Sequence, residues 1–553
     1  MQRQDDADLP AGPDRVRDLD GAESLLQGPA VAATDPGDGA EGPSSRAPAR
    51  VRRATLIAVL AILAATGLDT TVISVALPTI RIDLGSSVTG IQWVSSVYML
   101  ALALILVPAG RLTDSLGPRR VMRMGLLGYL VSSAAAAAAP DTLVLILARA
   151  GQGFAAGLVA PATVVLIEAA FGASRRGRAF GLVAMFLAVA SAAGPVVGGA
   201  FTDTIGWRAI FVVHFAMALV SLVMTTRAAD PPGDGRRVAM DPLALLGMSV
   251  VVVGLQLAII EGGQRGLAWG VTFIAAAAVG AAVLFMRDRR AEEPLVDLSL
   301  MRRPPVLAAV LCRVAVSFAF FGNLFYLTLF LQGPAGYSAL QTGLILLPSS
   351  LVGIASAPLA GRLVDRIGAD VTLVVGTAAA ALSLFALAVV HETSSVPLHL
   401  LPALALNGFG YALTAVGAKV APLASVAQHL KGRVTALVSV TARLAAGFGV
   451  TFATGLFNLV LGPSIGRAFE VVGVRPSDEA RQFIVGHIGA ADLPATVTAQ
   501  SAASAGFASA DQAVAAVDKA FALSYSLLSG IVGTLVVFVV LGLVVLLRRK
   551  RAE

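Results

Sequence analysis

Two stretches of the sequence share one pattern: GRLTDSLG at residues 110–117 and GRLVDRIG at residues 361–368. Each follows directly after a long apolar run, so each belongs to a loop at the end of an apolar segment. An internal repeat at this distance indicates that the chain is built from two related halves.

The overall composition indicates which solvent surrounds the chain. It has 553 residues, of which 56% are hydrophobic and 14% charged, and its mean hydropathy is +0.81. An average soluble domain is about one quarter charged, so we expect an all-α polytopic membrane protein and not a soluble enzyme. Because about 20 apolar residues cross the hydrocarbon core as one helix, the chain has room for about a dozen or more spans.

A hydropathy window of about 19 residues places fourteen spans along the chain. The repeated loops follow the second and the tenth of them, and therefore lie on one side of the membrane. Two six-helix bundles with two inserted helices between them explain this offset. The predicted spans are 54–79, 89–110, 121–139, 142–170, 179–200, 207–226, 241–261, 268–286, 305–332, 340–361, 371–390, 398–427, 434–462 and 520–547.

The segments outside the spans complete the predicted division. Residues 1–50 lack apolar periodicity and are rich in Asp, Gly, Pro and Arg, which is typical of a disordered tail. Residues 463–518 are long, polar and Ala-rich; we expect an outer loop there, with short amphipathic helices as one possible form. The division is a tail at 1–50, a first bundle at 51–228, inserted helices and linkers at 229–303, a second bundle at 304–547, and a basic tail at 548–553.

The distribution of charge predicts the orientation. The net charge is +7, and Lys and Arg gather in alternate short loops, for example Arg119 and Arg120, while the loops between them hold scattered charges such as Asp141. Cytoplasmic loops carry the Lys and Arg excess, so both termini are expected in the cytoplasm. This pattern is one of topology, which argues against a nucleic-acid surface. The Ala-, Gly- and Arg-rich composition favours a bacterial plasma (inner) membrane.

One carboxyl group lies inside the first span. Asp69 costs about 2.5–3.5 kcal/mol in a membrane helix unless it faces a cavity or a partner. Arg149 in the fourth span is the best partner by depth, because both residues lie roughly 10 to 16 Å below the outer surface at 1.5 Å per residue. Two interpretations stay open: a static ion pair that joins the two spans, and a proton-carrying carboxyl with its cationic partner.

The repeated loop is interpreted as a gate element. A glycine at its start permits close helix approach, and Asp114 is placed to accept hydrogen bonds from helix-end N–H groups. The alternative, plain positive-inside topology, explains the arginines but not the Asp that is repeated at one spacing. The predicted gate residues are Gly110, Asp114, Gly117, Arg119, Arg120 and Asp365.

Four motifs in order carry a family resemblance: GLDTTVISVALP at 67–78, GRLTDSLG at 110–117, LARAGQG at 147–153 and GPVVGG at 194–199. With the span count and the repeat, the chain after residue 50 resembles the major facilitator superfamily, in particular its fourteen-span drug/proton antiporter branch. The sequence departs from the family pattern at Ser115 and Pro118.

The resemblance implies a function. It implies a proton-coupled exporter of amphipathic, often cationic, drugs or natural products, with Asp69 and Arg149 in proton coupling. In the resembled family the fourth motif marks exporters, which assigns Gly194, Pro195, Gly198 and Gly199 to an antiporter helix. Taken alone, the same glycines at i and i+4 indicate ordinary tight packing.

Further polar and aromatic residues inside the spans are candidates for a substrate cavity between the bundles. We expect Gln152, Phe321, Phe325, Asn407 and Lys419 in this cavity. For Arg313 and Arg443 two interpretations stay open, a snorkelling side chain and a functional charge, whereas His214 is interpreted as a structural, hydrogen-bonded residue.

No GxxxxGK[ST] loop, HExxH motif or metal-ligand cluster occurs in the sequence, so neither ATP nor a metal or other cofactor is expected, and the energy is expected to come from an ion gradient. The resemblance implies that this is a proton gradient. The expected partners are a small amphipathic substrate, protons and the lipid bilayer, with the protein acting as a monomer. Two alternatives remain: a carrier of the same fold that moves lipid or nutrient, and a non-transporting membrane scaffold that uses its outer loop.

Overall fold

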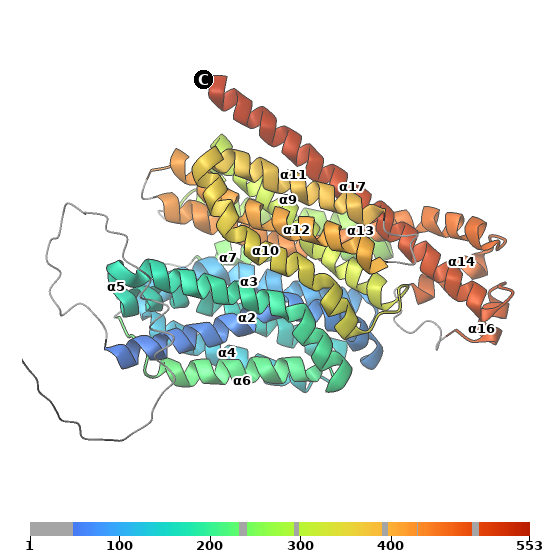
Figure 1. Cartoon of the computed structure of the whole chain (residues 1–553), viewed down its shortest axis with the longest axis horizontal. Coiled ribbons are helices and arrows are strands. Elements are labelled where there is room, and N and C mark those ends of the chain that lie inside the picture. Colours follow the sequence, from blue (N-terminus) through green and yellow to red (C-terminus); the bar gives the residue numbers. More distant parts are fainter. Residues whose placement is uncertain are drawn as a thin grey trace, which may run out of the picture.

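The computed structural model describes residues 48–231, 241–291, 298–389, 396–427, 430–488 and 497–552, and within these ranges it contains helices and no strands (Figure 1). The expected disordered tail at 1–50 lies almost wholly outside the described residues. Thirteen helical segments of the described chain are long and apolar enough to cross a membrane. A fourteenth expected span is α4 (Pro118–Ala137), whose early arginines lower its hydropathy.

The helix bundle has two ends, which we name for what lies at them. The terminal face is the end where α2 (Ala49–Asp83) begins and α17 (Ala510–Ala552) ends. The cap face is the opposite end, where α14 (Asp478–His487) and α16 (Ala499–Ser504) lie. In Figure 1 the terminal face is on the left and the cap face on the right.

The N half consists of α2, α3 (Val88–Leu116), α4, α5 (Thr142–Thr204) and α6 (Arg208–Thr225). Side-chain caps fix where two of these helices begin. The Ser87 hydroxyl accepts from the backbone N–H of Gly90, and the Asp141 carboxylate accepts from that of Val144, which satisfies N–H groups that have no partner in the first helical turn.

The helix α5 contains two of the expected spans, Thr142–Phe171 and Ala179–Thr204. The Arg208 guanidinium, just beyond α5, donates to the carbonyl of Ala139, just before it, at 3.1 Å. Both ends of α5 therefore lie at the cap face. A straight helix of 63 residues would measure about 95 Å, so α5 reverses its direction at the terminal face between the two spans.

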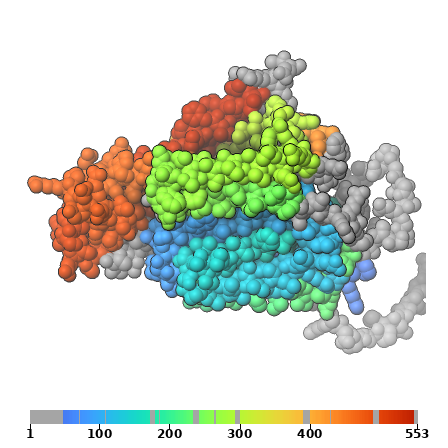
Figure 2. All heavy atoms as spheres, turned by 180° about the vertical axis from the view of Figure 1, so that it is seen from behind, coloured from blue at the N-terminus to red at the C-terminus, as the bar shows by residue number. Residues whose placement is uncertain are grey.

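The inserted pair consists of α7 (Pro242–Arg265) and α8 (Leu267–Asp288), which pack closely through glycines. A Cβ on Gly247 would lie 2.8 Å from the carbonyl oxygen of Gly280. The amide of Gln256 on α7 donates to Ser96 on α3 at 3.0 Å and to Thr451 on α13. The pair lies over the seam between the halves (lime in Figure 2) and is hydrogen-bonded to both of them.

The C half consists of α9 (Pro304–Gln332), α10 (Ala339–Ile367), α11 (Ala369–Ala388), α12 (Val396–Val420), α13 (Lys431–Val472) and α17. A capping box of Ser338 and Gln341 starts α10. The short 3₁₀ helices η2 (Leu298–Arg302) and η4 (Ala421–Ser425) precede α9 and follow α12.

The segment 463–518 differs in form from the expected loop. It contains α14 and α16, but α13 continues to Val472 and α17 begins at Ala510, so two spanning helices supply much of it. Buried apolar side chains such as Ile484 and Phe507 belong to the main core cluster, because they pack on these extensions. The expected basic tail at 548–553 likewise continues α17 up to Ala552.

The repeated sequence folds into repeated structure. Gly117 separates α3 from α4 with φ 85°, and Gly368 separates α10 from α11 with φ 89°. Residues other than glycine rarely adopt this backbone conformation, which explains the final Gly of both copies. The fourteen-helix architecture of two six-helix bundles and an inserted pair is thus the one that the sequence predicts.

Candidate functional site

The buried ion pair lies inside the N half. Asp69 on α2 and Arg149 on α5 meet at 2.5 Å between Oδ1 and Nη1, and their side chains are 0% and 1% exposed. The depth match in the sequence predicted this pairing. Taking two charges out of water costs several kcal/mol per ion, so the pair requires compensating hydrogen bonds.

The guanidinium of Arg149 has such partners beyond the carboxylate. It donates to the side-chain oxygen of Gln152 at 3.1 Å and to the carbonyl of Val94 at 3.3 Å, and the ring centre of Tyr98 lies 4.5 Å from it. Arg149 therefore keeps two acceptors and an aromatic face when Asp69 is neutral. Protonation of the carboxyl does not leave a bare buried cation.

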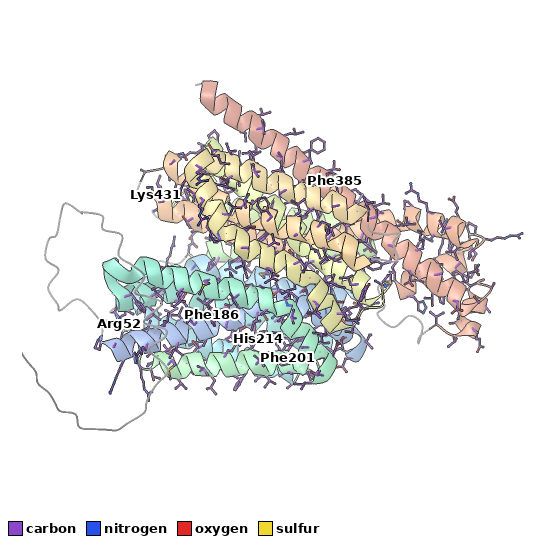
Figure 3. All side chains as sticks on the ribbon, viewed as in Figure 1. Arg52, Phe186, Phe201, His214, Phe385 and Lys431 are labelled. Atoms are coloured by element: carbon purple, nitrogen blue, oxygen red, sulfur yellow. The ribbon has the colours of Figure 1, made fainter. Side chains whose placement is uncertain are left out.

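His214 on α6, labelled in Figure 3, is a third member of this cluster. Its Nδ1 lies 3.5 Å from the Asp69 Oδ1, and its ring meets Tyr129 and Phe211 edge-on. Neither His214 Nδ1 nor Asp69 Oδ2 has a hydrogen-bond partner among the described residues. Sequence reasoning took His214 for a hydrogen-bonded structural residue, and no pattern in the sequence placed it beside Asp69.

A cavity of about 480 Å³ lies between the halves, on the terminal side of the molecule's centre. The N half contributes α2, α3 and both spans of α5, and the C half contributes α9, α10, α12 and α13. Its walls carry the aromatic side chains Tyr98, Phe320, Phe321 and Tyr411, with serine hydroxyls among them. This size and mixture of groups suit a drug-sized amphipathic molecule.

Tyr98 separates the ion pair from this cavity. Its ring lines the cavity, and it also lines a small pocket of about 20 Å³ beside Asp69 and Arg149. Tyr98 is 0% exposed, and its hydroxyl has no hydrogen-bond partner in the described chain. Met99, Phe321 and Ala446 also line both pockets, so one layer of side chains, with Tyr98 among them, lies between the carboxylate and the cavity.

The five expected cavity residues divide into two groups. Phe321 and Lys419 line the cavity. Gln152 does not, because it lies one helical turn from Arg149 on the same face of α5 and hydrogen-bonds Arg149 and Ser133. Phe325 and Asn407 line smaller separate pockets, because the faces of α9 and α12 that carry them turn into the helix contacts around the cavity.

The GPVVGG motif forms close contacts on two sides. A Cβ on Gly198 would lie 2.6 Å from the carbonyl oxygen of Val72 on α2, and one on Gly194 would collide with Thr71. On the other side, a Cβ on Gly199 would lie 2.6 Å from the Cα of Leu340 on α10. Gly343 of α10 meets the backbone of Pro195 equally closely. The motif therefore joins the N half to the C half near the cap face.

Hydrogen bonds between the halves reinforce this contact. The Asp203 carboxylate accepts from the Ser338 hydroxyl at 2.8 Å and from the Leu340 N–H at 2.9 Å. The Gln332 amide donates to the carbonyl of Val75 at 2.7 Å. With the glycine contacts, they close the cap end of the cavity.

The gate loops agree with the expectation in part. Gly117 has the positive φ that the loop needs, and Asp114 and Asp365 are exposed at the terminal face. Arg119 donates to the Thr225 carbonyl at the end of α6 and to Asp230 in the segment after it, each at 2.9 Å. Arg120 is exposed.

The expected role of Gly110 needs correction. A Cβ on it would meet no atom within 4 Å, so this glycine does not permit a close helix contact in the present conformation. The neighbouring helices are apart at this end of the bundle, whereas the close contacts between the halves lie toward the cap face.

Two repeated helix bundles around a shared cavity, with buried charges beside it, define a polytopic membrane transporter. The sequence model of the Major Facilitator Superfamily matches residues 59–450, and the chain belongs to this superfamily. The resemblance drawn from the four motifs is thereby confirmed.

Similar proteins include several resistance proteins. The tetracenomycin C resistance and export protein of Streptomyces glaucescens is 31% identical over 62% of this chain and 64% of its own length. Multidrug resistance protein Stp of Mycobacterium tuberculosis is 34% identical over 68% of this chain and 70% of its own. The puromycin resistance protein pur8 of Streptomyces alboniger is 33% identical over 71% and 80%, respectively.

Solved structures show the same fold at low identity. A bacterial homolog of the human lysosomal transporter Spinster superposes with a TM-score of 0.63 at 15% identity, covering 91% of this chain and 98% of that one.

Proposed function

We propose that the protein is a proton-coupled antiporter that exports amphipathic drugs or natural products across the bacterial plasma membrane by alternating access. The observation that carries the proposal is the buried Asp69–Arg149 pair one side chain away from a drug-sized cavity. The printed names of the relatives, which describe drug resistance and export, support this direction and substrate class.

The orientation follows from charge. Arg52 and Lys431 lie at the terminal face (Figure 3), and loops rich in Lys and Arg stay in the cytoplasm. With the terminal face in the cytoplasm, the structure corresponds to an inward-facing state, whose cavity lies on the cytoplasmic side of the closed contacts at the cap face. Substrate then enters from the cytoplasm or the inner leaflet.

The coupling step uses the neutral form of Asp69. A proton that arrives from outside binds the carboxylate and removes its attraction for Arg149, which keeps Gln152 and Val94 as acceptors. The Tyr98 ring contacts both the guanidinium and the cavity. A shift of the guanidinium therefore moves this ring at the cavity wall. Release of the proton to the cytoplasm restores the ion pair, while substrate binding and release alternate with these two states.

The test is transport by the purified protein in liposomes under an imposed pH gradient. We expect wild-type protein to move a fluorescent amphipathic substrate only while the gradient lasts, and a protonophore to abolish this movement. Asp69→Asn retains the shape but cannot titrate, so gradient-driven transport should be lost while substrate binding persists. Asp83→Asn, on the same helix in an exposed pair with Arg208, is the matched control.

Two results would contradict the proposal. Wild-type transport that ignores the pH gradient excludes proton coupling, and undiminished gradient-driven transport by Asp69→Asn excludes this carboxyl as the carrier. Transport directed only toward the cytoplasm would favour an uptake carrier of the same fold.

A further inference from the structure

Three cationic side chains converge on the cavity from three helices of the C half. Arg313 comes from α9, Lys419 from α12 and Arg443 from α13. They are near enough for the charges of Arg313 and Arg443 both to act on Lys419. The residues are far apart in sequence, so the fold alone assembles this cluster.

The cluster lacks a negative partner. None of the described residues that line the cavity is Asp or Glu, and the nearby Asp69 lies behind Tyr98 and is paired with Arg149. Lys419 and Arg443 make no hydrogen bond or ion pair with any described residue. Three like charges in a partly dehydrated cavity raise its energy, and a bound anion would lower it.

Within the described chain, Arg313 has one guanidinium nitrogen with a hydrogen-bond partner and one without. Its Nη2 donates to the Tyr411 hydroxyl at 2.8 Å, and its guanidinium carbon lies 4.4 Å from the centre of the Tyr411 ring. Its Nη1, in contrast, is buried without a hydrogen-bond partner among the described residues. A buried donor normally has an acceptor, and Arg313 offers this one at the cavity wall.

Snorkelling does not explain the position of Arg443, although Lys419 is exposed in the last turn of α12. Arg443 lies twelve residues after Lys431, the first residue of α13, which places it about 18 Å from that end of the helix. An arginine side chain is too short to reach the aqueous boundary over that distance. Of the two interpretations that the sequence leaves open for Arg443, the structure supports the one in which it faces the cavity.

The wall beside the cations is aromatic. The Phe320 ring lies 4.6 Å from the Tyr411 ring and 5.3 Å from the Phe321 ring, centre to centre. Tyr411 belongs to both features, because its ring faces Phe320 while it also holds Arg313. A flat ring with an acidic substituent would place its ring on this wall and its charge against the cations.

We propose that the cavity binds amphipathic aromatic anions, such as aryl carboxylates, phenolates or sulfonates, in preference to the cationic drugs expected from the sequence. This proposal rests on the proposed function, since it names the substrate class of the same cavity. Arg443 and Lys419 supply the charge, Arg313 supplies a directed donor, and the aromatic wall supplies apolar contact.

The test compares two probes of one shape and opposite charge: 2-naphthalenesulfonate and trimethyl(2-naphthyl)ammonium. Their binding to the full-length protein is measured in nanodiscs of phosphatidylcholine. We expect the sulfonate to bind at least about tenfold more tightly, since hydrogen bonds to charged groups contribute differences of this order or larger. Equal binding, tighter binding of the ammonium compound, or binding of neither probe would overturn the proposal.

Variants assign the effect to the cluster. Lys419→Gln and Arg443→Gln should each weaken sulfonate binding by about tenfold or more, whereas Lys431→Gln, the same change on α13 outside the cavity, should leave it unchanged. Lys419→Glu should reverse the preference toward the ammonium probe. Each variant is checked for monodisperse, folded protein; unchanged sulfonate binding in folded Lys419→Gln and Arg443→Gln would overturn the assignment.

Anionic lipid is a second source of the same chemistry. Repeating the measurement in nanodiscs with phosphatidylglycerol should not alter sulfonate binding, and loss of binding there would reassign the cations to a lipid headgroup and overturn the proposal. Transport is scored separately. Sulfonate binding without gradient-driven movement would refute the exporter while leaving the anion site intact, and gradient-driven movement of the ammonium probe alone would do the opposite.

Discussion

The buried contact between Asp69 and Arg149 is compatible with two roles, a static ion pair and a proton-coupling pair. The other hydrogen bonds of Arg149 distinguish between these roles. A static pair needs only mutual neutralisation. A coupling pair also needs a cation that tolerates losing its anion, and the bonds from Arg149 to Gln152 and Val94 meet that requirement. The Nδ1 of His214, 3.5 Å from the carboxylate, has no hydrogen-bond partner among the described residues.

The first prediction separates the two interpretations by stability. If the pair is static, Arg149→Ala strands a buried carboxylate and lowers the free energy of unfolding by about 3–5 kcal/mol, and the Asp69→Asn/Arg149→Ala double variant recovers most of that loss. If the pair couples protons, the double variant folds but shows no gradient-driven transport. Thermal unfolding in detergent and transport normalised to folded protein measure both effects. Recovery of fold and activity together in the double variant would exclude the coupling role.

The second prediction concerns Tyr98, the partition between pair and cavity. Tyr98→Phe removes a hydroxyl without a partner in the described chain and keeps the ring over Arg149, so transport should be retained. Tyr98→Ala removes the ring and costs about 3–5 kcal/mol of stability, as aromatic truncations in cores do. It should also open a route between the cavity and the carboxylate. Proton leak into liposomes without substrate measures that route, and leak equal to wild type would argue against the partition.

At the scale of elements, the contact of α5 with α10 closes the cap end of the cavity. The backbone of α10 is so close to Gly199 that any side chain there must push the helices apart. In the proposed alternating-access cycle the same contact opens in the outward-facing state, so its fit would set the balance between the two states. The GPVVGG motif, which by itself indicates ordinary helix packing, thus forms part of the interface between the two halves.

The third prediction tests this contact. Gly199→Ala should separate α5 from α10 and lower transport, whereas Gly181→Ala on the same helix meets no atom within 4 Å and should behave as wild type. Closure is measured by disulfide cross-linking of Asp203→Cys with Ser338→Cys, whose native side chains are 2.8 Å apart. Native Cys312 is buried, which keeps background reaction low. Equal cross-linking in both glycine variants would show that the contact does not control closure.

The fourth prediction compares the two repeated loops. Asp114→Ala should lower transport by about tenfold, equivalent to about 1.4 kcal/mol on the barrier between states, with little loss of folded protein because the side chain is exposed. Asp365→Ala should have a smaller effect, since Arg119 and Arg120 follow the first loop and no arginine pair follows the second. Transport normalised to folded protein is the measurement. Equal tolerance at both sites would leave the repeat with a topological role alone.

At the scale of the whole molecule, the cap and the terminal face should lie on opposite sides of the membrane. The fifth prediction places a cysteine at Glu470 or Asp511, both exposed near the cap, and expects labelling of intact cells by a membrane-impermeant maleimide. A cysteine at exposed Arg366, at the terminal face, should label only after permeabilisation. The reverse pattern would invert the orientation and, with it, the direction of transport.

Patterns along the chain were enough to predict the architecture. Long apolar runs fixed the fourteen spans, because each must bridge the same hydrocarbon thickness. The repeat at 110–117 and 361–368 fixed the two halves, and its last glycine fixed a backbone turn that Gly117 and Gly368 both adopt. Counting residues from the helix ends also paired Asp69 with Arg149, since depth in a membrane helix is proportional to sequence distance.

The tertiary structure decided in which direction each side chain points around its helix axis. Gln152 turns to Arg149, and Phe325 and Asn407 turn away from the cavity, although their depths alone allowed all three to line it. Arg313, Lys419 and Arg443 converge for the same reason. Sequence distance gives the height of a residue in the membrane, whereas helix packing sets its rotation and neighbours. Rotation depends on contacts between distant segments, so the convergence of the three cations appears only once the helices of the C half are packed together.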